Sequence, residues 1–179
     1  MTTRPAARRK PLVGVLMGSE SDLGTMAECA RVLEAHAVAY EVRVLSEHRT
    51  PEAATAYARG AEARGLKALL AGAGGSAHLA GVLTAHTLLP VIGVPLAGSP
   101  LGGFDALLAT VQMPPGIPVA TVGVGAMGAK NAGHLAVAIL ALADPGLRAR
   151  LRGRRAAMTR EVLEKSEGLE QRLRQLLEA

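Results

Sequence analysis

Short apolar runs alternate with amphipathic segments along most of this chain, and this alternation constrains its fold more than any other feature. The run at residues 12–17 is apolar without interruption, which is typical of a strand buried on both faces of a parallel sheet. Further strands are predicted at 40–44, 68–71, 91–94 and 119–124, and helices at 23–33, 51–64, 77–88, 104–111 and 129–142.

Strand and helix thus alternate in five units joined by short connections, which requires a parallel sheet covered on both faces by right-handed crossovers. We predict an α/β protein with a flavodoxin-like three-layer sandwich, strand order 2-1-3-4-5 and an additional C-terminal helix. This order brings the loops after the first, second and third strands together at the carboxyl edge of the sheet. Ligands bind at that edge in such folds.

The 179 residues fit one domain with an extension at each end. Residues 1–10 contain Arg, Lys and Pro without periodicity and are expected to be a disordered basic tail. The sheet domain is expected at 11–143. Residues 144–179 are predicted to form a helical extension in which Gly153 and Gly168 weaken the helix. We expect its apolar stripe to pack on a neighbouring subunit. The stripe consists of Leu147, Leu151, Met158, Val162, Leu169, Leu173 and Leu176.

Composition narrows the range of partners. The net charge is +5, with basic residues gathered at the two ends, but only 2% of residues are aromatic. Because bases would have almost nothing to stack on, a solvated tail and helix face are favoured over a nucleic-acid patch. The single cysteine, Cys29, excludes an internal disulfide and favours a reducing cytoplasm. No apolar stretch approaches a membrane span.

Residues 45–51, Leu-Ser-Glu-His-Arg-Thr-Pro, give the strongest indication of chemistry. Thr50 and Pro51 fit the N-cap and first position of the following helix. His48 and Arg49 are therefore expected just ahead of a helix N-terminus, where Arg49 can bind an anion and His48 can transfer a proton.

The loops after the first and third strands supply candidates for the same site. Residues 18–22, Gly-Ser-Glu-Ser-Asp, offer hydroxyls, backbone amides and a helix N-terminus capped by Asp22, which suit a phosphate or a ribose. Alone, this segment could equally be a capped turn. His78 closes a glycine-rich loop at the same edge as His48 and is expected in the site. The other histidines, which fall in or at the ends of helices and are interpreted as structural or solvated, are His36, His86 and His134.

Two segments, 72–77 and 123–128, match the dinucleotide pattern G-x-G-x-x-G/A. Neither lies in the first strand–helix unit, and neither is followed about 20 residues later by an acidic residue that ends a strand, so NAD or FAD binding is the weaker interpretation. No Walker lysine follows a glycine-rich loop, no His/Cys/carboxylate spacing resembles a metal site, and no Ser-x-Gly elbow indicates a hydrolase.

Four segments, in this order along the chain, resemble the N5-carboxyaminoimidazole ribonucleotide mutase family of bacterial purine biosynthesis. They are 17–22 (MGSESD), 46–51 (SEHRTP), 71–79 (AGAGGSAHL) and 111–114 (VQMP), and the similarity extends from about Val13 to Leu142. The resemblance implies a flavodoxin-like fold, a homo-octamer in which the C-terminal helix reaches a neighbour, and no metal or organic cofactor.

The resemblance also assigns roles to individual residues. His48 would be the acid/base of the reaction. The residues implied to hold the ribose phosphate are Ser19, Ser21, Asp22, Ser46 and Arg49. The residues implied to surround the migrating carboxylate are Gly74, Gly75, Ser76, His78 and Leu79.

Three positions depart from the family pattern. The family usually has Ala where this chain has Glu47 and Ser76, and Pro where it has Ala80. Glu47 adds a negative charge beside the expected base, so the proton chemistry of His48 is the property that this departure affects most directly.

The implied reaction moves a carboxylate from the exocyclic nitrogen to C4 of the same imidazole ribonucleotide. The protein must protonate the nitrogen, retain CO2 and then remove the C4 proton, and one histidine can perform both proton transfers. A closed pocket of backbone amides can retain the CO2.

Three alternatives remain at this point. The related branch carboxylates aminoimidazole ribonucleotide directly with CO2, although Arg49 and the Gly-Gly-x-Ala-His loop resemble the mutase branch. A nucleotide- or flavin-binding module would keep the first loop but would not need His48. A purely structural oligomer would tolerate changes at both His48 and Asp22.

Overall fold

The structure, a computed structural model, describes residues 10–178, so nearly all of the predicted basic tail lies outside the described residues. The chain divides into two compact units, one ending at Leu140 and the other beginning at Ala141, and each is described by itself.

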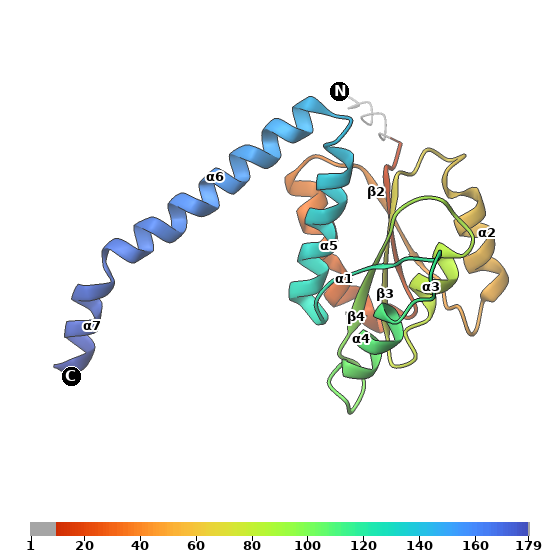
Figure 1. Cartoon of the computed structure of the whole chain (residues 1–179), viewed down its shortest axis with the longest axis horizontal. Helices are drawn as coiled ribbons and strands as arrows, with labels where there is room; N and C mark the ends of the chain where they lie inside the picture. The colour runs from red at the N-terminus through yellow and green to blue at the C-terminus, as the bar shows by residue number, and fades with distance from the viewer. Residues whose placement is uncertain (1–9, 179) are drawn as a thin grey trace, which may run out of the picture. The chain divides into compact units, whose positions relative to one another are not determined.

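The first unit contains a five-stranded parallel sheet of order β2-β1-β3-β4-β5, which confirms the predicted fold (Figure 1). Helices α1 and α5 pack together on one face, while α2, α3 and α4 share a core on the other. The strands are β1 (Val13–Met17), β2 (Tyr40–Val44), β3 (Ala68–Gly74), β4 (Val91–Leu96) and β5 (Ala120–Thr121). The helices are the 3-10 turn η1 (Glu20–Asp22), α1 (Leu23–Ala35), α2 (Pro51–Ala61), α3 (Leu79–Thr84), α4 (Phe104–Val111) and α5 (Gly125–Leu140).

Several element boundaries differ from the prediction. The fifth strand was expected at 119–124 but β5 has two residues, and α5 begins at Gly125 rather than 129. Gly128 lies against the carbonyl of Gly123, where any side chain would collide, so this glycine pattern forms a tight strand-to-helix turn. The third helix ends at Thr84 rather than 88, because the backbone turns ahead of Pro90.

The interior is packed on small side chains. Every residue of β1 is buried, as predicted, and β2 forms the sheet edge with Val44 52% exposed. At Gly72 of β3, an added Cβ would lie 2.4 Å from Sδ of Met26, so α1 can approach the sheet this closely only because the side chain is absent.

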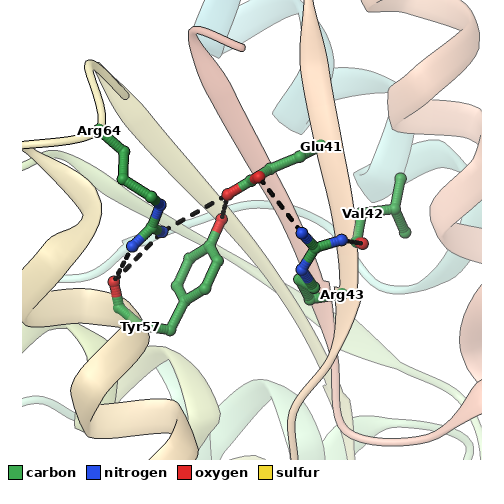
Figure 2. A network of polar contacts seen from close by, with 5 residues as sticks. All are labelled: Glu41, Val42, Arg43, Tyr57 and Arg64. Atoms are coloured by element: carbon green, nitrogen blue, oxygen red, sulfur yellow. Dashed lines mark hydrogen bonds and ion pairs between the residues drawn. The ribbon is translucent and has the colours of Figure 1, made fainter. Parts of the chain in front are cut away.

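A polar network ties α2 to β2, the two elements that flank the His48 loop (Figure 2). The Tyr57 hydroxyl donates to Oε1 of Glu41 at 2.7 Å, and the same carboxylate lies 3.4 Å from Arg64 and 3.7 Å from Arg43. The Arg64 guanidinium also lies 4.4 Å from the centre of the Tyr57 ring. Burial, and then the hydrogen bond to Glu41, raise the pKa of Tyr57.

The second unit contains α6 (Pro145–Glu167) and α7 (Leu169–Leu177). Asp144 accepts a hydrogen bond from the Leu147 amide at 2.9 Å and so caps α6 as a helix start. Gly153 lies inside α6 without interrupting it, whereas Gly168 separates the two helices. The predicted stripe is largely uncovered within this unit, with Leu176 77% exposed. Among residues 10–178, no helix is long and apolar enough to cross a membrane.

Candidate functional site

The strand order brings three loops to one edge of the sheet. Met17 at the end of β1 pairs with Val44 of β2 and Gly72 of β3, so the chain leaves all three strands side by side. Between the loops lies a cavity of about 470 Å³, a volume typical of small-ligand sites. Its lining residues are Gly18, Ser19, Ser21, Asp22, Ser46, Glu47, His48, Arg49, Ala73, Gly74, Gly75, Gly98 and Ser99.

The first loop is held by its own serines. Ser19 Oγ accepts hydrogen bonds from the Ser21 amide at 3.3 Å and the Ser21 hydroxyl at 2.9 Å, and it caps η1. Asp22 occupies the N-cap position of α1, but its side chain makes no capping hydrogen bond, contrary to the prediction. Burial raises the pKa of Asp22, and hydrogen bonding with Ser19 and Ser21 opposes that shift. Asp22 is also one of the residues that line the cavity.

Arg49 of the second loop contacts the first loop. Arg49 Nη2 donates to the Gly18 carbonyl at 2.8 Å, and its Nε donates to Ser46 Oγ at 3.2 Å. Thr50 sits at the N-cap of α2 as predicted, but its hydroxyl donates to the Ser46 carbonyl at 2.9 Å and makes no cap bond. Because Ser46 is buried, these contacts fix the loop at its base and hold Arg49 between the two loops.

His48, which lines the cavity, contacts His78, which is not among the lining residues. His48 Nε2 lies 2.9 Å from His78 Nδ1, at hydrogen-bond distance, and the rings are arranged edge to face. The other ring nitrogen of His48, Nδ1, lies 3.5 Å from Oε1 of Glu47. Both ring nitrogens of His48 therefore have partners that can exchange or hold a proton.

The third loop contributes backbone to the cavity. Gly75 has φ = 57°, a conformation that favours glycine, and Gly74 lies beside the Leu96 carbonyl. Ser76 is exposed and does not line the cavity. The Leu79 side chain is fully buried in the core under α3, so its predicted place in the site is available only to its backbone.

The sequence interpretation missed Gly98 and Ser99. Both follow β4, and Ser99 is fixed by a 2.8 Å hydrogen bond from its hydroxyl to Asp105. The predicted strand order could have indicated them, since β4 also ends at the carboxyl edge next to β3. The fourth resembling segment, 111–114, does not reach the cavity; its Met113 packs beside Gly81 of α3.

Other candidate features lie elsewhere. His36 and His134 form an edge-to-face ring pair 5.9 Å apart, and His86 lines a separate cavity of about 660 Å³ beside the start of β4. The glycines at 123–128 do not line the 470 Å³ cavity. Within the part of the chain that the structure describes, no three His, Cys, Asp or Glu side chains are grouped to hold a metal ion.

Comparison with known proteins identifies the family to which this chain belongs. The profile of the AIR carboxylase family matches residues 12–161. The N5-carboxyaminoimidazole ribonucleotide mutase of Pyrococcus horikoshii is 52% identical over 162 residues, covering 90% of each chain. The enzyme of the same name from Mycobacterium tuberculosis (strain H37Rv) is 57% identical over 147 residues, covering 82% of this chain and 83% of the relative.

A solved structure also resembles this chain over most of its length. The crystal structure of Treponema denticola PurE superposes with a TM-score of 0.80 at 28% identity, covering 89% of this chain and 98% of that one. The profile match spans most of the sheet unit and all three loops of the cavity. This chain belongs to the AIR carboxylase family.

Proposed function

We propose that this chain is a mutase, an isomerase that converts N5-carboxyaminoimidazole ribonucleotide to 4-carboxy-5-aminoimidazole ribonucleotide in de novo purine (IMP) biosynthesis. The observation that carries the proposal is His48, held at a cavity rim with a proton-exchanging partner on each ring nitrogen, in a chain 52–57% identical to relatives named for this reaction. The family profile, which matches residues 12–161, includes every loop of the cavity.

The proposed chemistry uses His48 twice. As the carboxylate carbon leaves the exocyclic nitrogen, the bonding electron pair stays on nitrogen, which takes a proton from His48. C4 then attacks the released CO2, and His48 removes the C4 proton, restoring the aromatic ring and its own protonated state. Substrate and product are isomers, so no net proton is consumed.

We assign substrate binding to the three loops around His48. Arg49 and the hydroxyls of the first two loops face a common space beside the N-terminus of α2, which suits the ribose phosphate. The residues proposed for this role are Ser19, Ser21, Asp22, Ser46 and Arg49. Gly74 and Gly75, with His78 and the Leu79 backbone, would enclose the CO2; Ser76, which does not line the cavity, would act only from the outer side of this loop. Neither a metal nor an organic cofactor enters the proposed reaction.

We also propose assembly into a homo-octamer, with residues 144–179 packing on a neighbouring subunit. The support is the apolar stripe on α6 and α7, which lies largely exposed within its own unit. Apolar surface of this kind is normally covered by another chain. We further infer a cytoplasmic location, in keeping with the single unpaired cysteine.

The proposal is tested by following conversion of N5-carboxyaminoimidazole ribonucleotide by the purified protein and by His48→Asn. The variant keeps similar size but carries no transferable proton, so turnover should fall by at least about a hundredfold while ligand binding persists. His86→Asn, at the separate cavity, is the matched control and should retain activity. A folded His48→Asn protein with near-normal turnover would refute the mechanism, and activity only with aminoimidazole ribonucleotide and CO2 would favour the direct carboxylase.

A further inference from the structure

The Glu47 side chain is unusually buried for its place in the loop. Its side chain is only 6% exposed, although it stands in a loop whose next residue, His48, is 54% exposed. Among residues 10–178, the only polar partner of its carboxylate is the His48 ring, with Oε1 3.5 Å from Nδ1. The other oxygen, Oε2, lies over Gly18, 3.9 Å from where a Cβ would stand.

A largely buried carboxylate favours a nearby donor, because a polar group taken out of water without a partner is costly. The ring of His48 is the donor within reach, and an ionised carboxylate can only accept hydrogen bonds. At 3.5 Å from Oε1, Nδ1 is within ion-pair distance, and a hydrogen on Nδ1 is the arrangement that this carboxylate favours. In the neutral ring, the lone pair is then on Nε2.

Nε2 of His48 is also the atom that faces His78, at 2.9 Å from Nδ1 of that ring. With Nδ1 committed to Glu47, the neutral His48 ring can accept at Nε2, and the protonated ring can donate from the same atom. Glu47, His48 and His78 thus form a row of one carboxylate and two imidazoles in which a single ring atom of His48 gains and loses the proton.

We propose that Glu47 is a positioning residue that fixes the Nδ1–H tautomer of His48 and orients Nε2 as the proton-transferring atom. Its kinetic consequence rests on the proposed mutase function, in which Nε2 gives its proton to the exocyclic nitrogen and later takes one from C4. Glu47 acts through His48 and does not itself touch the reacting atoms. Because the ring is half exposed, the loss of its carboxylate anchor frees it to rotate and change tautomer.

The direct test is 15N NMR of protein labelled at its histidine rings, under conditions where the His48 ring is neutral. The His48 signals are assigned by their loss in His48→Asn. We expect Nδ1–H to predominate in the parent protein and Nε2–H to gain in Glu47→Ala, whereas Glu47→Asp keeps a carboxylate and should restore part of the parent pattern. Glu52→Gln removes an exposed charge five residues away and should leave the ring signals unchanged.

The kinetic arm uses the same variants with N5-carboxyaminoimidazole ribonucleotide. Glu47→Ala should lower kcat by at least about tenfold with KM changed less than about twofold, the signature of a group that acts on the chemical step rather than on binding. Glu47→Asp should recover part of kcat, whereas a merely structural role would not give this split with recovery; the NMR tautomer separates positioning of the ring from a purely electrostatic effect. Thermal unfolding of each variant checks that the fold is retained.

The two arms separate failure of this proposal from failure of the proposed function. A parent protein in which His48 carries its proton on Nε2, or a tautomer that Glu47→Ala leaves unchanged, overturns the role of Glu47 whether or not the protein is a mutase. A shifted tautomer with unchanged kcat in an active enzyme overturns the catalytic consequence. If the parent shows no mutase activity, the NMR result alone decides whether Glu47 positions the ring.

Discussion

Replacement of Arg49 by Ala is expected to weaken substrate binding with little cost to folding. The guanidinium bridges two loops through the Gly18 carbonyl and Ser46 Oγ, at the cavity rim and ahead of α2. A charge-assisted hydrogen bond to a phosphate contributes about 1.5 to 3 kcal/mol. At about 1.4 kcal/mol per factor of ten, KM for N5-carboxyaminoimidazole ribonucleotide should rise between about 10- and 150-fold.

The folding cost of the same change should be small. Arg49 is an exposed residue, and its bonds to Gly18 and Ser46 can be replaced by water, so we expect a loss of less than about 1 kcal/mol in urea unfolding. Arg49→Lys keeps the charge but not the planar fork that spans both loops, and should give an intermediate KM. Arg59→Ala, at the exposed C-terminal end of α2, is the control. An unchanged KM in a folded Arg49→Ala protein would remove Arg49 from the site.

Three further predictions concern the rest of the chain. Tyr57→Phe deletes the hydroxyl bound to the Glu41 carboxylate and should lower the free energy of unfolding by about 1 to 2 kcal/mol. Tyr40→Phe, at a more exposed hydrogen bond, is the control and should lower it less. Equal losses would contradict the importance of the network. Cys29 is fully buried, and burial raises its pKa to about 12. It should therefore resist thiol reagents at neutral pH until the protein unfolds. Rapid labelling of the native protein would disprove this. Removal of residues 145–179 should lower the oligomer mass in sedimentation or the solubility, and an unchanged subunit number and melting temperature would argue against packing of that segment on a neighbour.

Some features of the fold follow from local patterns and were predictable. The unbroken apolar run of β1 can be satisfied only by burial on both faces, and the short connections between strands and helices leave parallel crossovers as the solution. Asp144 followed by Pro145 starts a helix whatever surrounds it, because the cap involves only residues in the first turn. The predicted strand order was enough to bring the loops of Ser19, His48 and Gly74 to one cavity.

Helix capping and side-chain burial were harder to predict from the sequence. Thr50 has the residue type and place of an N-cap, yet its hydroxyl is drawn to the buried backbone of Ser46 four residues earlier. Leu79 lies within a segment that resembles a ligand loop, but α3 begins there and turns its side chain into the core. For Thr50 a competing local hydrogen bond decides, and for Leu79 burial in the tertiary core decides, between options that residue type alone leaves open.

Most of the residues that line the cavity were predicted from the sequence, whereas their contacts with one another were decided by the tertiary structure. His48 and Arg49 stand out in the sequence because a reactive pair ahead of a helix N-terminus has no role in packing. That His48 meets His78, 30 residues away, could not be deduced, because this contact depends on the register of β1, β2 and β3. Sequence patterns report neighbours along the chain, whereas proton transfer depends on neighbours in space.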